Sequence, residues 1–271
     1  MSNEQTTAVV NWDEELAKYA KEDSAPEQGN AGGKFFSVKG ATLSWSGVPI
    51  KNNQIGVIIA AAIIEHSFYE DKYVPGEYAA PVCFAFGRVE SEMAPHPLSS
   101  KPQSPRCEDC PQNQYPSKEE KAKTGRGGKP CANVRRLALL PAGEFDKAGV
   151  FQPEEDVVHF AEVGPGYLKV PVTSVKDYST FVVHNDDVLH RPTWSVYTRV
   201  RVLPDPDNTL KVVFDVLGAC PTSILPALKA RHDELQATIA FPYTAASKTA
   251  APVSDAANAA PASASAKAEK Y

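Results

Sequence analysis

The sequence predicts a mainly β fold of the α+β class. Many short runs are rich in aromatic and β-branched residues and are separated by Gly, Pro, Asn or Asp, a pattern typical of strands. Only two segments have clear helical periodicity, and no internal repeat or coiled-coil heptad is visible. Strands this short and numerous favour a β-barrel or a β-sandwich with helical additions. The expected strands are residues 35–45, 78–88, 134–140, 157–163, 167–172, 194–203 and 210–217.

Residues 54–62 form an apolar run that is expected to be a buried strand or a short helix. The last two strands are separated by Pro204-Asp205-Pro206-Asp207-Asn208, a turn signal that predicts a hairpin. Helices are expected over residues 174–184 and 221–240. One face of the second helix would carry Ile224, Leu225, Leu228, His232, Leu235 and Ile239.

The two ends of the chain differ in composition from its middle. Residues 1–33 contain seven acidic and two basic side chains, which accounts for the net charge of −5, and they predict an acidic disordered tail. Residues 244–271 are dominated by Ala, Ser, Pro and Lys and predict a second disordered tail, because they have too little apolar surface to bury. Residues 34–243 remain for one domain of roughly 210 residues.

The composition also indicates the compartment. The longest apolar run, residues 55–64, is too short to cross a bilayer, so no membrane partner is expected. Residues 1–12 have neither a basic start nor an apolar core, which argues against a secretory signal. Five cysteines in a large, non-secreted chain favour metal binding, a catalytic thiol or simple burial over a disulfide framework.

Four of these cysteines have the spacing of a metal site. Cys83 is followed after 23 residues by Cys107-Glu108-Asp109-Cys110, and Cys131 follows after another 20. A CxxC turn places two thiolates on one side of a tight loop, and two more complete the four soft ligands that Zn²⁺ prefers. The residues between them are rich in Pro, Ser, Gly, Lys and Gln, so a metal is the natural reason for this insertion, at about 83–131, to be ordered.

Other interpretations of the cysteines remain open. An iron–sulfur cluster uses the same ligands, and His96 could replace one cysteine. A thioredoxin-like redox motif needs a strand before the CxxC and a helix after it, whereas Cys107 and Cys110 stand between prolines. The cysteines could also be incidental to a disordered loop. Cys220 is expected to be a buried apolar residue.

The sequence offers cations and aromatic rings that could bind single-stranded nucleic acid, by holding phosphates and stacking on bases. The basic loop between Cys110 and Cys131 could equally be a solvated loop that aids solubility. No hydrolase, metalloprotease, Walker or deaminase motif is present, so no enzymatic activity is expected. The candidate nucleic-acid contacts are Tyr115, Lys118, Lys121, Lys123, Arg126, Lys129, Arg135, Arg136, Trp194, Arg199 and Arg201.

The cysteine segment resembles a family of bacteriophage replication-region proteins taken to be single-stranded DNA-binding proteins. The motifs are Pro81-Val82-Cys83, Pro105-Arg106-Cys107-Glu108-Asp109-Cys110-Pro111-Gln112-Asn113, Gly127-Gly128-Lys129-Pro130-Cys131 and Arg135-Arg136-Leu137. More loosely, it is similar to the zinc-bearing single-stranded DNA-binding protein of T4-like phages, which has a histidine among its zinc ligands and an acidic C-terminal tail. Here all four candidate ligands are Cys, and the acidic tail is N-terminal.

The resemblance implies an OB-like barrel with a zinc-stapled loop insertion and a C-terminal helix. It also implies a protein that coats single-stranded DNA without sequence specificity during phage replication or recombination, in the cytoplasm of the bacterial host. Phage replication or recombination proteins would be its partners. The alternative functions are a phage structural or assembly protein with a structural zinc site, and a nuclease or recombination accessory factor with an iron–sulfur cluster.

Overall fold

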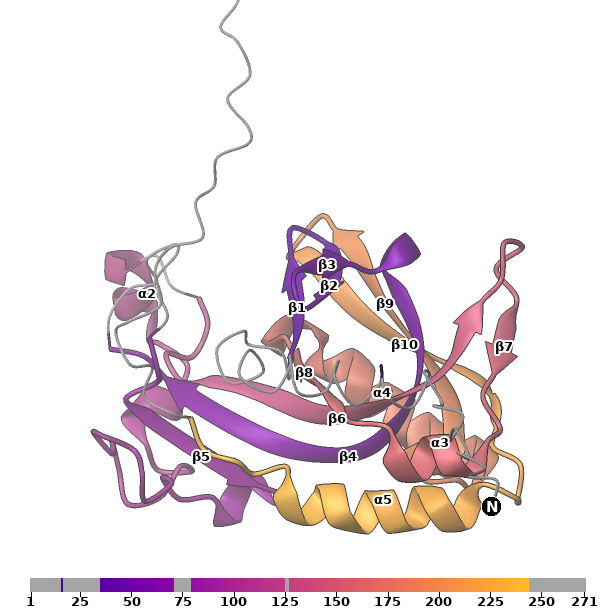
Figure 1. The fold of residues 1–271 in the computed structure, drawn as a ribbon. Coiled ribbons are helices and arrows are strands. Elements are labelled where there is room, and N and C mark those ends of the chain that lie inside the picture. The colour runs from indigo at the N-terminus through magenta and orange to yellow at the C-terminus, as the bar shows by residue number, and fades with distance from the viewer. Residues whose placement is uncertain (1–15, 17–34, 71–78, 125–126, 244–271) are drawn as a thin grey trace, which may run out of the picture.

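The computed structural model describes residues 16, 35–70, 79–124 and 127–243, without the side chains of Glu120, Lys123 and Thr124. The two expected tails therefore lie outside the described residues, apart from Leu16. Within the described part the chain is mainly β, with antiparallel sheets and few helices, as the sequence predicts. Figure 1 shows two long strands in the middle, helices on both sides and a small sheet above them.

The described strands form a small sheet and a large one. The small sheet contains β1 (Phe36–Lys39), β2 (Thr42–Trp45) and β3 (Val48–Pro49). The large sheet has the order β10-β9-β4-β6-β7, with β5 paired to β4 and β8 paired to β6. Its strands are β4 (Gln54–Phe68), β5 (Cys83–Gly87), β6 (Ala132–Phe145), β7 (Phe151–Pro153), β8 (Gly166–Val170), β9 (Val196–Asp205) and β10 (Thr209–Ala219). Among the described residues no ladder closes this sheet into a barrel.

β4 and β6 are the long central strands. They pair antiparallel along most of their length, with register shifts at Gly56/Val57 and at Ile59/Ala61. Such irregularities bend a strand and increase its twist. β4 pairs with β9 at its beginning, over Gln54–Val57, and with β5 at its end, over residues 64–68. The apolar run at 54–62 is thus a strand, and it continues six residues beyond the expected end.

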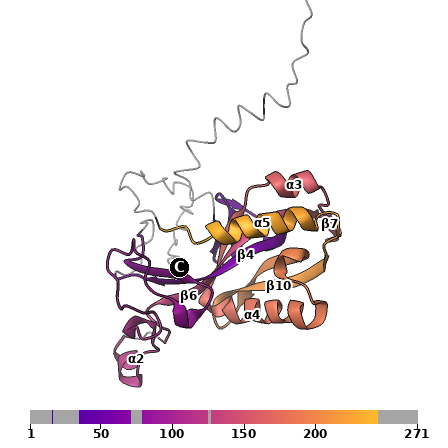
Figure 2. The same cartoon turned by 90° about the horizontal axis from the view of Figure 1, so that it is seen from below.

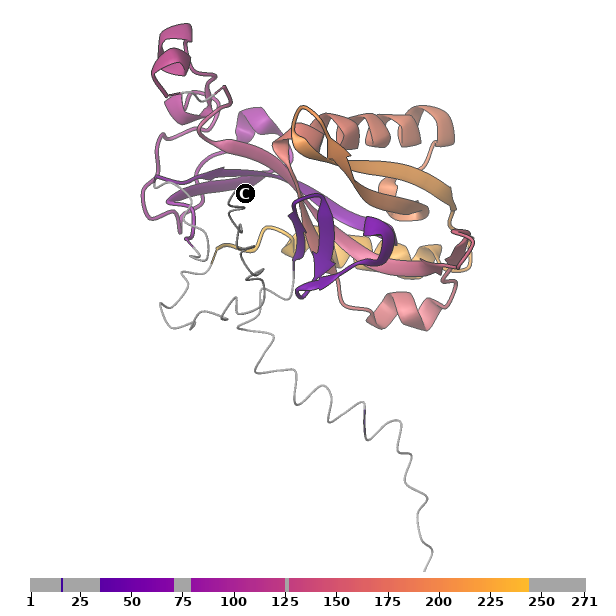
Figure 3. The ribbon, with the colours of Figure 1, turned by 90° about the horizontal axis from the view of Figure 1, so that it is seen from above.

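Both faces of β4 and β6 are buried, which explains why the sequence of β4 is an apolar run rather than an alternating pattern. Ile58 and Leu140 belong to a cluster that also contains Leu228 and Leu235 of α5 (Leu225–Thr238). The residues that alternate with these along the strands, such as Ile59, face the other side of the sheet. They belong to a second cluster with side chains of β2, β9, β10 and α4 (Val175–His184). Figure 2 shows α5 lying along β4 from below, and Figure 3 shows the small sheet and α4 from above.

Two tight turns build the small sheet. Gly40 and Ala41 have φ of 53° and 62° between β1 and β2, and Ser46 and Gly47 have φ of 48° and 81° between β2 and β3. Positive φ at both central residues is the type I′ geometry that matches the twist of a two-residue hairpin. The sheet covers the second cluster with the fully buried side chain of Leu43.

The expected strand at residues 157–163 is wrong, because this segment contains the short helix α3 (Val157–Glu162). The single strand expected at residues 35–45 is instead the antiparallel pair β1 and β2. Asp156 caps α3, accepting a hydrogen bond from the backbone N–H of Val158 at 2.9 Å. Phe160 is its buried residue, whereas Val157 and Val158 are exposed. The cap therefore outweighs the β-preference of the two valines. The expected helices at 174–184 and 221–240 and the hairpin of β9 and β10 are confirmed.

Candidate functional site

All four candidate metal ligands are brought to one place at the end of β4. Cys83 is the first residue of β5, Cys131 directly precedes β6, and Cys107 and Cys110 lie in the loop between these strands. Their exposed fractions are only 7% to 9%, and none is in a disulfide. The four cysteines line one small cavity of about 20 Å³. Sequence spacing alone predicted this convergence.

Backbone hydrogen bonds hold the loop around the cavity. The N–H of Cys107 donates to Met93 O at 2.9 Å, and the N–H of Cys131 donates to Gln112 O at 2.8 Å. The N–H of Cys110 donates to Cys107 O at 3.4 Å, which closes the turn of the CxxC motif. The buried amide of Asn113 adds a bond from Nδ2 to Cys107 O at 2.8 Å. The CxxC lies between short 3-10 turns, so the strand and helix of a thioredoxin-like motif are not its neighbours.

The electrostatics of the cavity favour neutral thiols as long as no cation is present. Burial raises the pKa of Cys107 to about 11 and that of Cys131 to about 12, and in each case the other cysteines of the cavity raise it further. The backbone N–H of Ser67 opposes this at Cys131, because it donates to the sulfur and favours the thiolate. A divalent cation would reverse the balance, since a coordinating thiol is deprotonated.

The donor set fits zinc in its chemistry and in its burial. Four thiols around one cavity are the donor set that closed structural zinc sites use. As their side chains stand, however, no group of three or more His, Cys, Asp or Glu in the described part of the chain is arranged to hold a metal ion. Binding of a metal ion therefore requires the four thiols to move toward the centre of the cavity that they line.

His66 is the residue of this cavity that sequence reasoning missed. It lies on β4, is 1% exposed and lines the same cavity, and neither ring nitrogen has a hydrogen-bond partner. Burial lowers its pKa; Glu90, whose Oε1 is 3.8 Å from Nε2, opposes this, while Lys129 and Arg135 lower the pKa further. The sequence feature that could have identified His66 is its position at the end of an apolar strand. An imidazole buried there without a hydrogen-bond partner is energetically costly.

His96, the histidine that the sequence suggested as a possible ligand, is not among the residues that line the cavity. Its Nδ1 accepts a hydrogen bond from the N–H of Leu98 at 3.1 Å. Its ring stacks on Phe84 with the ring centroids 5.0 Å apart. His96 therefore has a packing role in the loop, and the structure gives no support to a ligand role.

Part of the predicted nucleic-acid surface is exposed on the insertion. Tyr115 is 73% exposed, and Lys129 Nζ lies 5.3 Å from the centroid of its ring. Lys118 and Lys121 are exposed on α2 (Lys118–Thr124), which projects away from the sheets in Figure 1 and Figure 3. Arg126 and the side chain of Lys123 lie outside the described residues. The insertion thus presents the exposed ring of Tyr115 and two exposed lysines on α2.

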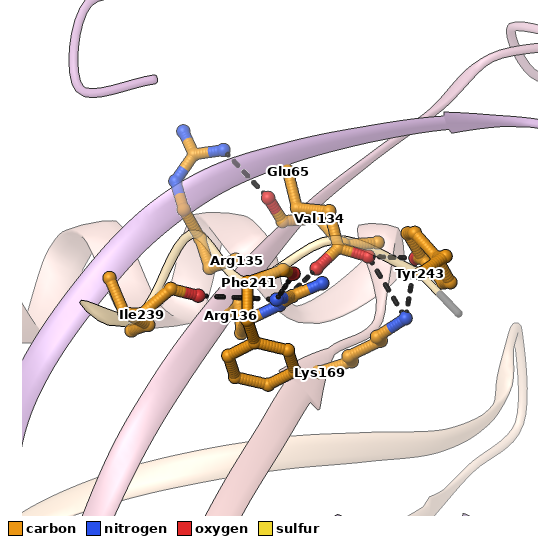
Figure 4. A network of polar contacts seen from close by, with 8 residues as sticks. All are labelled: Glu65, Val134, Arg135, Arg136, Lys169, Ile239, Phe241 and Tyr243. Carbon is orange, nitrogen blue, oxygen red and sulfur yellow. Dashed lines mark hydrogen bonds and ion pairs between the residues drawn. The ribbon is translucent and has the colours of Figure 1, made fainter. Parts of the chain in front are cut away.

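Arg136 does not belong to this surface, and its assignment as a DNA contact is corrected. It is 1% exposed, and its Nε lies 2.5 Å from Glu65 Oε2. Its Nη1 donates to Ile239 O at 3.1 Å and to Phe241 O at 2.8 Å (Figure 4). The guanidinium also lies over the rings of Phe86 and Phe241, at 4.4 and 4.3 Å from their centroids. Arg135, one residue earlier, is half-buried on the opposite face of β6 and donates to Val134 O.

Glu65 is the centre of this buried network. Its Oε1 lies 2.9 Å from Lys169 Nζ and accepts a hydrogen bond from the Tyr243 hydroxyl (Figure 4). Burial alone would raise the pKa of Glu65, but Lys169, Arg136 and the Tyr243 hydroxyl lower it below its usual value. Burial lowers the pKa of Lys169, against the opposing effect of Glu65. The network fastens the chain after α5 to β4, β6 and β8, which is a structural role.

The three remaining candidates lie on or beside β9. Trp194 stacks on His232, with centroids 5.7 Å apart, and packs against the α5 side of the sheet, so its role is structural. Arg199 and Arg201 are half-buried and share one carboxylate, with distances of 3.2 and 2.9 Å to Asp215 Oδ2. Two guanidiniums on one carboxylate leave one net positive charge there.

Comparisons with known proteins found no relative of this chain. No family model, no curated protein and no solved structure matches it. None of the helices in the described part of the chain is long and apolar enough to cross a membrane. The geometry of the site is therefore the basis for assigning a function.

Proposed function

We propose that this protein is a non-enzymatic single-stranded DNA-binding protein of a bacteriophage, with an OB-like domain and an insertion stapled by zinc. It would coat DNA in the cytoplasm of the bacterial host, beside phage replication or recombination proteins. The observation that carries the proposal is the insertion, in which four buried cysteines share a cavity and Tyr115, Lys118 and Lys121 are exposed.

A zinc ion is proposed because the insertion has four converging thiols and only a small apolar cluster of its own. The apolar cluster of this region consists of Ala85, Met93 and Cys107, with Ile64 packed against it. Cys83, Cys107, Cys110 and Cys131 would bind Zn²⁺, and the ion would supply a cross-link between β5, the loop and the start of β6. An iron–sulfur cluster is the less favoured occupant of the same four thiols.

Single-stranded DNA is proposed because the insertion combines a ring with exposed cations. The Tyr115 ring is exposed enough to stack on a base, and Lys129 beside it can hold the adjoining phosphate. Lys118 and Lys121 extend the positive charge along α2, where Glu119 is the one acidic residue with a described side chain. A duplex offers no free base face to this ring, so single strands should be preferred.

Titration of a fluorescent oligo-dT at two salt concentrations, with a duplex of equal length as control, tests the proposal. Binding should favour the single strand, tolerate other base sequences and weaken steeply as salt rises. Metal analysis of the same sample should give about one zinc per chain. Equal affinity for duplex, or no binding at micromolar protein in low salt, would reject the proposal and leave a phage structural or assembly protein with a structural zinc site.

A further inference from the structure

A second hollow lies at the opposite end of β4 from the cysteines. Its volume is about 660 Å³, which is within the range of ligand pockets in proteins. We call it the Trp45 groove. Its walls come from the small sheet, the start of β4, the end of β6 and the approach to β8. The residues that line it include Phe36, Trp45, Lys51, Asn52, Gln54 and Gly164.

The rings of Phe36 and Trp45 pack against each other and against β8. Phe36 and Trp45 are cross-strand partners in β1 and β2, and their ring centroids are 4.6 Å apart. Both rings lie against Gly166 of β8, where an added Cβ would come within 2.5 Å of Phe36 and 2.9 Å of Trp45. Glycine at this position therefore lets the rings seat against β8, and both remain half-buried at the wall of the groove.

Polar side chains lie around these rings. Lys51 and Asn52 are exposed, and Gln54 is half-buried at the start of β4. Asn52 has a φ of 56°, a left-handed conformation that Asn and Gly tolerate better than other residues. Its amide and that of Gln54 each offer donors and an acceptor, which suits the edge of a nucleobase.

Strand β9 pairs with the start of β4 beside the groove. Gln54 is the register partner of Arg201, and Gly56, which also lines the groove, is the partner of Arg199. These are the two arginines that share the carboxylate of Asp215. Lys51 adds a cation of its own, and Glu144 is the acidic residue of the lining. Lys51 and Glu144 balance each other in the lining, which includes neither arginine, so the rings and the amides are what the groove offers to a ligand.

We propose that the Trp45 groove binds a nucleobase of single-stranded DNA, stacked on Trp45 and Phe36, with a flanking phosphate near Lys51. This inference rests on the proposed function and adds a second contact site to it. The groove is lined by residues 54–57 of β4, and the cysteine cavity is lined by residues 66 and 68 of the same strand. The two sites are therefore separated by roughly 30 to 45 Å of strand. A single chain of several nucleotides would bridge the two sites.

Blocking the groove while the fold is kept intact tests the inference. Gly164 lines the groove, and a Cβ there would meet no atom within 4 Å, so Gly164→Leu adds an apolar side chain at the groove from a position with open space around its Cβ. Gly218→Leu is the matched control, because Gly218 also has open space around its Cα and lies outside the lining. Asn52→Gly removes one amide and keeps the left-handed backbone.

Affinities for oligo-dT and for an abasic chain of equal length separate base binding from phosphate binding. Gly164→Leu should lose about fivefold or more in affinity for oligo-dT, the equivalent of one lost stack, and little for the abasic chain. Asn52→Gly should weaken oligo-dT binding in the same direction, and Gly218→Leu should behave as wild type. Wild-type affinity in Gly164→Leu, with single-strand preference retained, would overturn the groove and leave the proposed function standing. Absence of any DNA binding by the wild type would overturn both.

Discussion

Arg136 and Glu65 form an ion pair across β6 and β4, at diagonal positions of the ladder. Glu65 is in register with Val134, and Arg136 with Ile63, so the two side chains reach toward each other over one step of the sheet. Both are at most 1% exposed. Because water cannot solvate these buried charges, each is stabilised by the opposite charge of its partner.

Removal of one partner should therefore be costly. Arg136→Met keeps an unbranched side chain but leaves Glu65 without its nearest cation, and it should lower the free energy of unfolding by about 3 kcal/mol. Arg135→Met, one residue earlier and half-buried, should change it by about 0.5 kcal/mol at most. Denaturant unfolding of both variants measures the difference. Similar losses in the two variants would contradict the role of the buried pair.

The same pair should make stability depend on acidity. The pKa of Glu65 is lower in the folded protein than its usual value of 4.5, so its contribution is fully present above pH 4.5 and is lost as pH falls through the folded pKa. Below about pH 4.5 the free energy of unfolding of the wild type should fall more steeply than that of Glu65→Gln, by up to about 1.4 kcal/mol per pH unit. Parallel pH profiles from unfolding experiments would show that Glu65 does not titrate in this way.

Zinc binding at the cysteine cavity should depend on Cys110 and should not depend on Cys220. Purified protein is expected to be colourless and to contain about one zinc per chain. Cys110→Ser should lose the metal and loosen the insertion, because it removes one of the four thiols at the cavity. Cys220→Ser is the matched control, since Cys220 is equally buried but belongs to the apolar cluster beneath α5. A brown sample would indicate an iron–sulfur cluster, and a metal-free folded protein would exclude both.

His66 should influence that metal although no motif in the sequence marks it. Its ring nitrogens are buried at the cavity without partners, and a metal-bound thiolate would be a stronger hydrogen-bond acceptor than a free thiol. His66→Leu should weaken metal affinity by about tenfold or more, measured by competition with a chromogenic chelator. His96→Leu, on a histidine outside the lining of the cavity, should leave the affinity unchanged. Equal affinities in the two variants would assign His66 to packing alone.

The sequence predicted much of this fold because its strongest signals are local. The turn around Pro204 to Asn208, the apolar face of α5 and the CxxC spacing each depend on neighbouring residues, and each is found as expected. Burial of a charged residue is not a local property. Arg136 follows Arg135 in a basic motif, and only the distant Glu65, Ile239 and Phe241 determine that it points inward.

The Trp45 groove was unpredictable for the same reason. Its lining joins residues 36–57 to residues 141–145 and 164–166, which no pattern in the sequence links. The strand prediction at α3 failed for a different reason. One capping Asp outweighed the strand preference of two valines, which are exposed to solvent. The long-range contacts of the sheet, rather than propensity, determine which aromatic rings are core and which remain available to a ligand.

Binding of DNA by the insertion should depend on Tyr115 and on the lysines of the insertion. The ring and the lysines should affect the affinity and its dependence on salt in different ways. Tyr115→Ala removes a stacking ring and should cost about 1 to 3 kcal/mol of binding free energy at every salt concentration. Replacing Lys118 and Lys121 by Ala should instead flatten the dependence of affinity on salt, by about 0.7 in the logarithmic slope for each phosphate that is no longer bound. Lys176→Ala on α4 is the control, because Lys176 is exposed but lies outside the insertion. Folding should be unchanged in all of these variants, since the altered side chains are exposed. Fluorescence titrations at two salt concentrations resolve both effects, and an unchanged slope in the double lysine variant would remove α2 from the DNA-binding surface.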